Sequence, residues 1–144
     1  MFQSDDALYQ ARCHRWPMAD FKKLDVWQKA RELAVNTIQA CDEMAGATAS
    51  IVRNQLVRAV MSVPSNIAEG SAKKSDREFA RFLRISLGSA TEAENHLIIA
   101  TDLHLLDQTT FEKLNKRVED VRKMLTGLEK RLTSDAEKRS VRRT

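Results

Sequence analysis

The stretch RAVMSVPSNIAEGSAKKSDREFARFLRISLGS, residues 58–89, decides the fold of this chain. It joins two long runs of apolar residues at helical spacing, with Pro64 inside the first run, Gly70 at its end and Ser75 before the second. Ser75 and Glu78 have the spacing of a capping box, in which each side chain accepts a backbone N–H at a helix N-terminus. The stretch therefore predicts two helices joined by a short turn.

Hydrophobic periodicity extends this pattern to four helices, expected at about 25–45, 49–69, 75–104 and 107–132. Asp25 is the expected N-cap of the first, and Gly46 and Gly70 are the expected terminators of the first two. Because loops of a few residues make each helix run back along the one before it, the sequence predicts an all-α, antiparallel up-down four-helix bundle. The positions expected to face its core recur every three or four residues: Val26, Trp27, Ala30, Leu33, Ala34, Thr37, Ile38, Cys41 and Met44; Val52, Leu56, Ala59, Val60, Val63 and Ile67; Phe79, Phe82, Leu83, Ser86, Ala90, Ala93, Leu97 and Ala100; and Phe111, Leu114, Val118, Val121, Leu125, Leu128 and Leu132.

One domain, residues 21–132, accounts for all four helices. Residues 1–20 lack the periodicity and are expected to form an N-terminal tail, in which Met18 marks a possible natural start. Residues 133–144 are expected to form a basic C-terminal tail. A chain of 144 residues with 31% charged and 42% hydrophobic residues is typical of a single helical domain with its own core.

The composition excludes several other classes of protein. No uncharged stretch approaches the roughly 18 to 20 apolar residues that a membrane-spanning helix needs. The N-terminus lacks the features of a signal peptide, so we expect a cytoplasmic protein without membrane contact. Cys13 and Cys41 form no CxxC or Cys/His cluster, and we expect both to be reduced thiols.

No motif for catalysis or metal binding is present. A di-iron bundle would need Glu-x-x-His motifs, but Ala93 and Thr101 stand three residues before His96 and His104. Glu92 and His96 are four apart, which we interpret as a surface helix pair. Phosphate-binding loops, nucleophile elbows and zinc-protease motifs are missing as well. We therefore expect a protein that is not an enzyme and that has no metal and no cofactor.

Two of the expected helices carry more apolar surface than one bundle core uses. Large exposed apolar patches mark interaction sites, so this surplus predicts self-association, unless loops or the tails cover it. The residues of the predicted oligomer interface are Val57, Met61, Pro64, Ala68, Ile98, Ile99, Leu103 and Leu106.

Pro64 is expected to bend or break its helix near Val60, because proline removes one backbone donor and its ring crowds the preceding turn. Ser62, Ser65 and Asn66 are placed to satisfy the freed backbone groups. Small residues at 86 and 88–90 would allow a close approach of the next helix beside this bend.

Three stretches resemble one known family in order and spacing: LDVWQKA (24–30), RAVMSVPSNIAEG (58–70) and FLRISLGSATEAE (82–94). The chain, over about residues 21–132, resembles the four-helix-bundle proteins encoded by intervening sequences of bacterial large-subunit ribosomal RNA genes. That family is similar in fold to the accessory variability determinant of diversity-generating retroelements, a homopentamer that associates with nucleic acid and a reverse transcriptase. The resemblance implies a ring-like homo-oligomer, with a pentamer favoured, and a nucleic-acid enzyme such as a reverse transcriptase as a further partner.

A stripe of basic residues suggests how the protein interacts. The expected nucleic-acid-binding residues are Lys73, Lys74, Arg77, Arg81 and Arg84, whose arginines share one face opposite Phe79 and Phe82. Repeated around a ring, the stripe would form a basic belt that binds RNA or DNA phosphates with weak sequence specificity. Residues 130–144 add a net charge of +4, whereas residues 21–129 carry only +1. The alternative is that the stripe is a solvated helix face and that the protein is a scaffold or adaptor for proteins alone.

Overall fold

Four long helices make up the computed structural model, which describes residues 20–143. They are α2 (Asp25–Cys41), α3 (Ala49–Ser71), α4 (Asp76–Asp102) and α5 (Gln108–Arg142), preceded by a short 3-10 helix, η1 (Phe21–Lys23). These residues contain no strand, so the all-α prediction is confirmed. The expected N-terminal tail lies outside the described residues, apart from Asp20.

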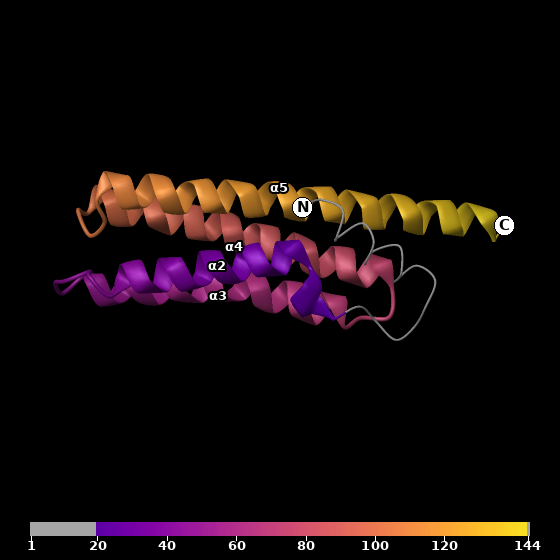
Figure 1. Cartoon of the computed structure of the whole chain (residues 1–144), viewed down its shortest axis with the longest axis horizontal. Helices are drawn as coiled ribbons and strands as arrows, with labels where there is room; N and C mark the ends of the chain where they lie inside the picture. The colour runs from indigo at the N-terminus through magenta and orange to yellow at the C-terminus, as the bar shows by residue number, and fades with distance from the viewer. Residues whose placement is uncertain (1–19, 144) are drawn as a thin grey trace.

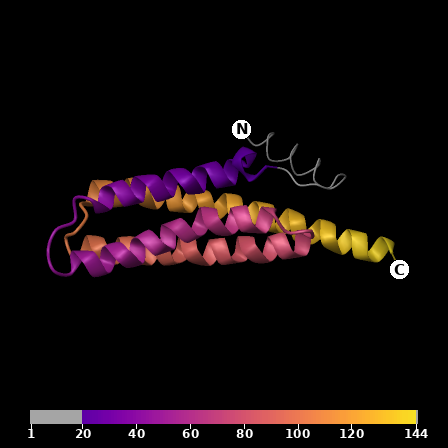
Figure 2. The ribbon, with the colours of Figure 1, turned by 90° about the horizontal axis from the view of Figure 1, so that it is seen from below.

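The four helices lie along a common long axis (Figures 1 and 2). The α2–α3 and α4–α5 connections lie at one end of the molecule, and the α3–α4 connection lies at the other. α4 packs against both α3 and α5, while α2 packs against α3 and α5. This arrangement is consistent with a four-helix bundle.

The core follows the predicted periodicity closely. Leu33, Leu56, Leu83 and Leu125, one from each helix, are fully buried. Every predicted core position is buried except Trp27, Ile38 and Phe111, which are half-buried and pack against the core. Complete burial of a leucine side chain stabilises the folded state by about 1.5–3 kcal/mol, so these stripes hold the helices together.

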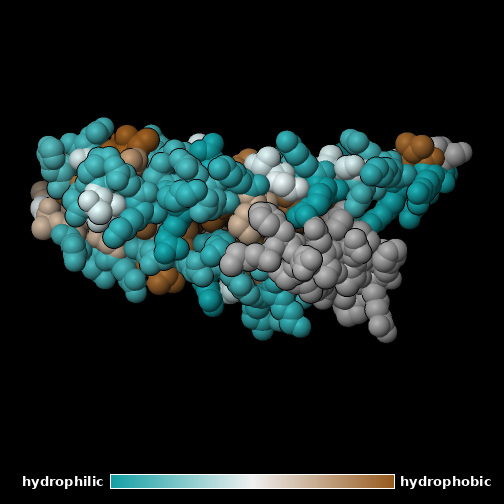
Figure 3. All heavy atoms as spheres, turned by 45° about the horizontal axis from the view of Figure 1, so that its top comes forward, coloured by the Kyte–Doolittle hydropathy of each residue, from teal (hydrophilic) through white to brown (hydrophobic). Residues whose placement is uncertain are grey.

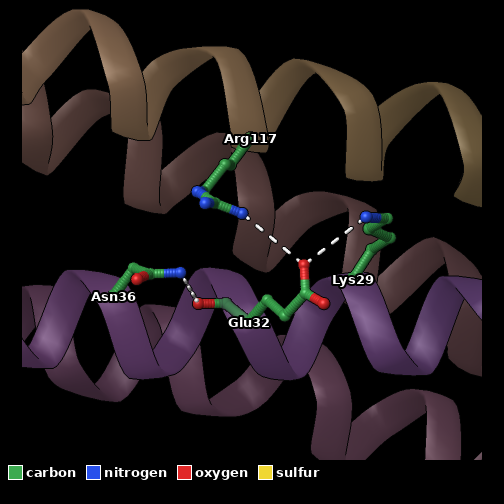
Figure 4. Close-up of polar contacts among 4 residues, drawn as sticks. All are labelled: Lys29, Glu32, Asn36 and Arg117. Carbon is green, nitrogen blue, oxygen red and sulfur yellow. Dashed lines mark hydrogen bonds and ion pairs between the residues drawn. The ribbon is translucent and has the colours of Figure 1, made fainter.

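Polar contacts attach α2 to its neighbours. Arg53 of α3 donates to the backbone carbonyls of Cys41 at 3.2 Å and Met44 at 2.6 Å, and so binds the last turn of α2 and the loop after it. Glu32 of α2 lies 3.5 Å from Lys29 in the same helix and 3.5 Å from Arg117 of α5 (Figure 4). These half-exposed ion pairs contribute little to stability, and only the pair with Arg117 joins α2 to α5.

The helix ends differ from the prediction in two places at α2. Leu24 is the N-cap and Asp25 is the first helical residue. The helix ends at Cys41 rather than near Ala45, because Arg53 satisfies the carbonyls there and Gly46 adopts a φ of +111° that continues the turn into α3.

Pro64 does not break α3, which continues through it as far as Ser71. Polar side chains bond the turn around the proline as expected, but at the carbonyls of Met61, Ser62 and Val63, not at that of Val60, whose usual donor Pro64 removes. Ser65 donates to the carbonyl of Met61 at 2.8 Å, and Asn66 donates to that of Ser62 at 2.8 Å. Ser86 of α4 donates to the carbonyl of Val63 at 2.6 Å, so the neighbouring helix helps to keep this turn helical.

Candidate nucleic-acid interface

The five predicted cations lie together where α3 turns into α4. Lys73 and Lys74 belong to the turn itself, and Arg77, Arg81 and Arg84 lie on the first turns of α4. The predicted cap holds this helix end, since the backbone N–H of Glu78 donates to Ser75 Oγ at 3.1 Å. Lys73 is half-buried and the other four side chains are exposed.

The contacts of these cations divide them into two groups. Arg84 donates to Glu129 Oε1 of α5 at 2.7 Å, and Thr133 donates to the same oxygen at 3.3 Å. Its charge is therefore partly neutralised within the chain. Among residues 20–143, Lys74, Arg77 and Arg81 have no ion pair.

Arg81 is not opposite the phenylalanine stripe, contrary to the sequence interpretation. Its guanidinium lies 4.6 Å from the centre of the Phe82 ring, and Lys73 Nζ lies 5.2 Å from the same ring. Phe82 sits at the edge of the core, so its neighbours in the turn and in the helix reach over it. A cation over a ring face is attracted by the ring quadrupole, which holds both side chains in place.

Helix α5 brings a second set of basic residues beside the first. It continues ten residues past the predicted end at Leu132, to Arg142, so most of the expected C-terminal tail is helical. The chain has no glycine or proline after Gly127, and Ala136 and Ser140 continue the spacing of Leu132 with small residues that line a groove beside α4. Arg139 of this segment pairs with Asp76, the first residue of α4, at 3.0 Å.

A shallow groove of about 350 Å³ separates the two helices at this point. Its walls carry both charges and hydroxyl groups. Its lining residues are Arg77, Ala80 and Arg84 from α4 and Thr133, Ala136, Glu137 and Ser140 from α5.

The charge of the described chain is concentrated at this end. We define the basic end as residues 73–84 together with residues 129–143, two segments that lie at the same end of the molecule (Figure 1). It contains eleven Lys and Arg against five Asp and Glu, a net charge of +6. The other described residues contain eleven Lys and Arg against thirteen Asp and Glu, a net charge of −2.

The predicted oligomer interface is exposed in part. Met61 is 48% exposed, Ile98 44%, Ile99 41% and Leu103 47%. Val57, Pro64 and Ala68 are half-buried. Figure 3 shows apolar patches surrounded by hydrophilic surface on the face that it draws.

Leu106 does not belong to that surface, because it is only 8% exposed and packs into the core. The sequence prediction extended α4 to His104, but the helix ends at Asp102 and His104 takes a φ of +59°. The backbone N–H groups of Leu105 and Leu106 then donate back to the carbonyl of Ala100, at 2.9 and 3.4 Å. This turn directs Leu106 inward.

The other residues considered for chemistry do not form a site. His96 Nε2 lies 3.3 Å from Glu92 Oε1 on one helix, which is the predicted surface pair. Cys41 is a buried free thiol whose pKa is raised by burial, with Arg53 acting in the opposite direction; Cys13 lies outside the described residues. Between residues 20 and 143, no three His, Cys, Asp or Glu side chains gather where they could hold a metal ion. In the same part of the chain, each helix is too short or too polar to cross a membrane.

The sequence predicted a second, flexible contact from the basic C-terminal residues, but not that they continue α5 and pair with α4. The pairs between Arg84 and Glu129 and between Arg139 and Asp76 join residues 45 and 63 positions apart, a separation at which sequence spacing gives no signal. The extension of α5 past Leu132 did have a signal in the sequence. Ala136 and Ser140 continue the helical spacing of the apolar stripe, but they are too small to be recognised as part of it.

Comparisons with known proteins agree with this fold. A crystal structure of a Bacteroides thetaiotaomicron protein of unknown function from the S23 ribosomal protein family is similar, with a TM-score of 0.67 and 23% identity, over 73% of this chain and 98% of that one. No curated protein matches the chain. The model of the 23S rRNA-intervening sequence protein family matches residues 22–127, which cover α2, α3, α4 and more than half of α5. The chain therefore belongs to the family of 23S rRNA-intervening sequence proteins.

Proposed function

We propose that this protein is a non-enzymatic homo-oligomer of antiparallel up-down four-helix bundles that binds nucleic acid through its basic end. The observation that carries the proposal is the uneven distribution of net charge, which is +6 at the basic end and −2 over the other described residues. A polyanion gains most from such a surface, because each phosphate that meets a cation releases condensed counterions. In this role the protein is an accessory or scaffold factor.

Weak sequence specificity follows from the kind of groups at the basic end. Lysine and arginine on the flank of a bundle contact phosphates, which fix position but carry no sequence information. Neither a cofactor nor a metal is required for such binding.

Self-association increases the effect of the basic end. The exposed side chains of Met61, Ile98, Ile99 and Leu103 form the surface that we propose to be buried between copies. A pentamer is favoured by the resemblance noted from the sequence, as is a nucleic-acid enzyme such as a reverse transcriptase as a further partner. Several basic ends in one ring would bind one polyanion with an affinity that exceeds that of a single copy.

A scaffold that binds only protein is the second candidate. It is favoured by the internal pairing of Arg84 with Glu129 and of Arg139 with Asp76, which neutralises part of the basic end. In this case the remaining charge has no ligand and serves only solubility.

The experiment that separates the two candidates reverses the unpaired arginines. An Arg77→Glu and Arg81→Glu double variant is compared with a Lys113→Glu and Lys123→Glu double variant, which changes the net charge equally outside the basic end. Binding of RNA and of DNA is measured by fluorescence anisotropy at two salt concentrations. We expect the first variant to lose at least tenfold in affinity and the second less than threefold.

Salt dependence gives an independent check. Removing two phosphate contacts should make the dependence of log K on log salt concentration less steep by about two. Arg84 is left unchanged, because its loss would also break the contact with Glu129 and confuse binding with stability. Equal behaviour of the two variants, or binding that ignores salt, would contradict the nucleic-acid proposal.

A further inference from the structure

We infer that the nucleic acid bound at the basic end is double-stranded and is held by its backbone phosphates, not by its bases. This inference rests on the proposed function and narrows it to one class of nucleic acid. Three features of the described residues carry it: the burial of the aromatic rings, the shape of the groove and the spacing of the cations along two helices.

Proteins that bind single strands without sequence preference stack the bases on exposed aromatic rings, each worth about 1–3 kcal/mol. Residues 20–143 contain five phenylalanine and tryptophan side chains, and none of these is exposed. The two at the basic end are the most deeply covered, since Phe79 is 2% exposed and Phe82 is 7% exposed. Lys73 and Arg81 also lie over the Phe82 ring, where a base would have to stack.

The phenylalanine and tryptophan rings away from the basic end also contact other side chains. Phe21 and Trp27 contact each other edge to face, with centroids 5.0 Å apart, and Arg31 lies 5.2 Å from the Trp27 ring centre. Phe111 is half-buried and packs against the core. The basic end therefore offers cations without an exposed phenylalanine or tryptophan ring.

The groove between α4 and α5 is too small to enclose a strand. Its volume of about 350 Å³ suits a single small group, and both walls are continuous helices. Single-strand binders track the flexible backbone through a long basic channel. Of the unpaired cations, Arg77 lines this short groove, whereas Lys74 and Arg81 lie outside it.

Cations spaced along rigid helices match a stiff polyanion better than a flexible one. Arg77 and Arg81 are one helical turn apart, about 6 Å along α4 at 1.5 Å per residue. Lys138 and Arg142 repeat that spacing on α5, which the ion pair between Arg139 and Asp76 attaches to α4. A duplex presents one charge per about 1.7 Å of its axis in a fixed geometry, so it meets these cations without losing the conformational freedom that a single strand would lose.

The test compares strands of one sequence in two states. The full chain is titrated with a labelled 20-base-pair duplex, and unlabelled duplex DNA, duplex RNA and each component single strand compete at equal phosphate concentration. We expect both duplexes to compete at least tenfold more effectively than either single strand. Single strands that compete as well as the duplexes would overturn this inference while leaving the proposed function intact. Absence of binding to every nucleic acid would overturn both.

A substitution at the covered ring gives a second readout. Phe82→Leu removes the only ring near the surface of the basic end and keeps an apolar side chain in the core. We expect single-strand and duplex affinities to change by the same factor, within about twofold. A selective loss of single-strand binding would show that Phe82 stacks on a base, and would overturn the inference by a route independent of the competition experiment.

Discussion

α3 approaches the phenylalanines of α4 closely at Gly70. A Cβ atom at this position would lie 2.6 Å from Phe82 Cβ and 2.8 Å from Phe79 Cδ2. The sequence interpretation treated Gly70 as a helix terminator, but α3 includes it and ends one residue later. Close packing against the two phenylalanines, rather than backbone freedom, therefore requires glycine here.

This close approach makes a specific prediction for Gly70→Ala. Overpacking costs about 1–3 kcal/mol, which outweighs the gain of up to about 1 kcal/mol from the better helix propensity of alanine. The matched control is Gly127→Ala in α5, where an added Cβ meets nothing within 4 Å, so the propensity gain should remain. Urea unfolding followed by circular dichroism should rank Gly127→Ala above the parent and Gly70→Ala below it. A Gly70→Ala protein at least as stable as the parent would show that the helices can separate without cost.

Two helix caps differ in their expected response to pH. Asp107 accepts the backbone N–H of Thr110 at 2.7 Å, and this hydrogen bond lowers the pKa of its carboxyl group below the ordinary value. A lowered pKa in the folded state means that the carboxylate stabilises the fold above the unfolded pKa, and that this contribution is lost as pH falls through the folded pKa. Ser75 caps α4 with a group that does not titrate.

Alanine at each cap should therefore give different profiles of stability against pH. Asp107→Ala is expected to lower the unfolding midpoint at pH 7, with a difference from the parent that narrows as pH falls below the ordinary carboxyl range. Ser75→Ala is expected to cost about 1 kcal/mol at neutral and at acidic pH. Urea midpoints measured between pH 2.5 and 7 check both; a constant difference for Asp107→Ala would mean that its charge does not contribute.

At the scale of the element, α5 shows what periodicity can and cannot predict. Its apolar stripe from Leu114 to Leu132 is strong, and every member is buried. Beyond Leu132, α5 meets α4 through the ion pair between Arg139 and Asp76 and along the groove lined by small residues such as Ala136, not through a wide apolar face. Hydrophobic periodicity therefore does not predict a helix after Leu132, although the backbone remains helical to Arg142.

The last turns of α5 should consequently depend on one ion pair. Arg139→Gln breaks the contact with Asp76, whose side chain is 9% exposed, and should increase amide hydrogen exchange over residues 133–142. The global free energy of unfolding should change by less than about 1 kcal/mol, because Arg139 itself is 47% exposed. Lys138→Gln, which removes the same charge at a neighbouring position, is the control and should leave exchange unchanged. Equal exchange in both variants would mean that the packing of Ala136 and Ser140 alone holds the segment.

At the scale of the whole molecule, burial within the chain could be predicted from the sequence, but the roles of its surface residues could not. Leucines near the end of one helix have different surroundings that the sequence does not distinguish: Leu103 stays exposed, while Leu106 turns into the core. The difference depends on the left-handed backbone at His104. Likewise, Arg77 and Arg84 look equivalent in sequence, yet only Arg84 meets an acid from α5. Tertiary contacts that span the chain decide such cases.

The prediction that concerns the whole molecule is that the protein self-associates. Ile98→Glu with Leu103→Glu places two charges on the exposed apolar side of α4, where each residue is more than 40% exposed and contributes little to the core of its own chain. Light scattering at micromolar concentration should show the parent as an oligomer and this variant at the chain mass of 16.4 kDa, with unchanged helix content. Ile51→Glu, at a side chain 63% exposed outside the predicted interface, should leave the oligomer intact.

Nucleic-acid affinity should fall at least tenfold in the monomeric variant even though its basic end is unaltered, because one basic end replaces several linked ones. A parent that scatters as a single chain would remove both the oligomer and the linked binding, whereas a monomeric variant that keeps full affinity would leave the basic end as a binding site that acts alone.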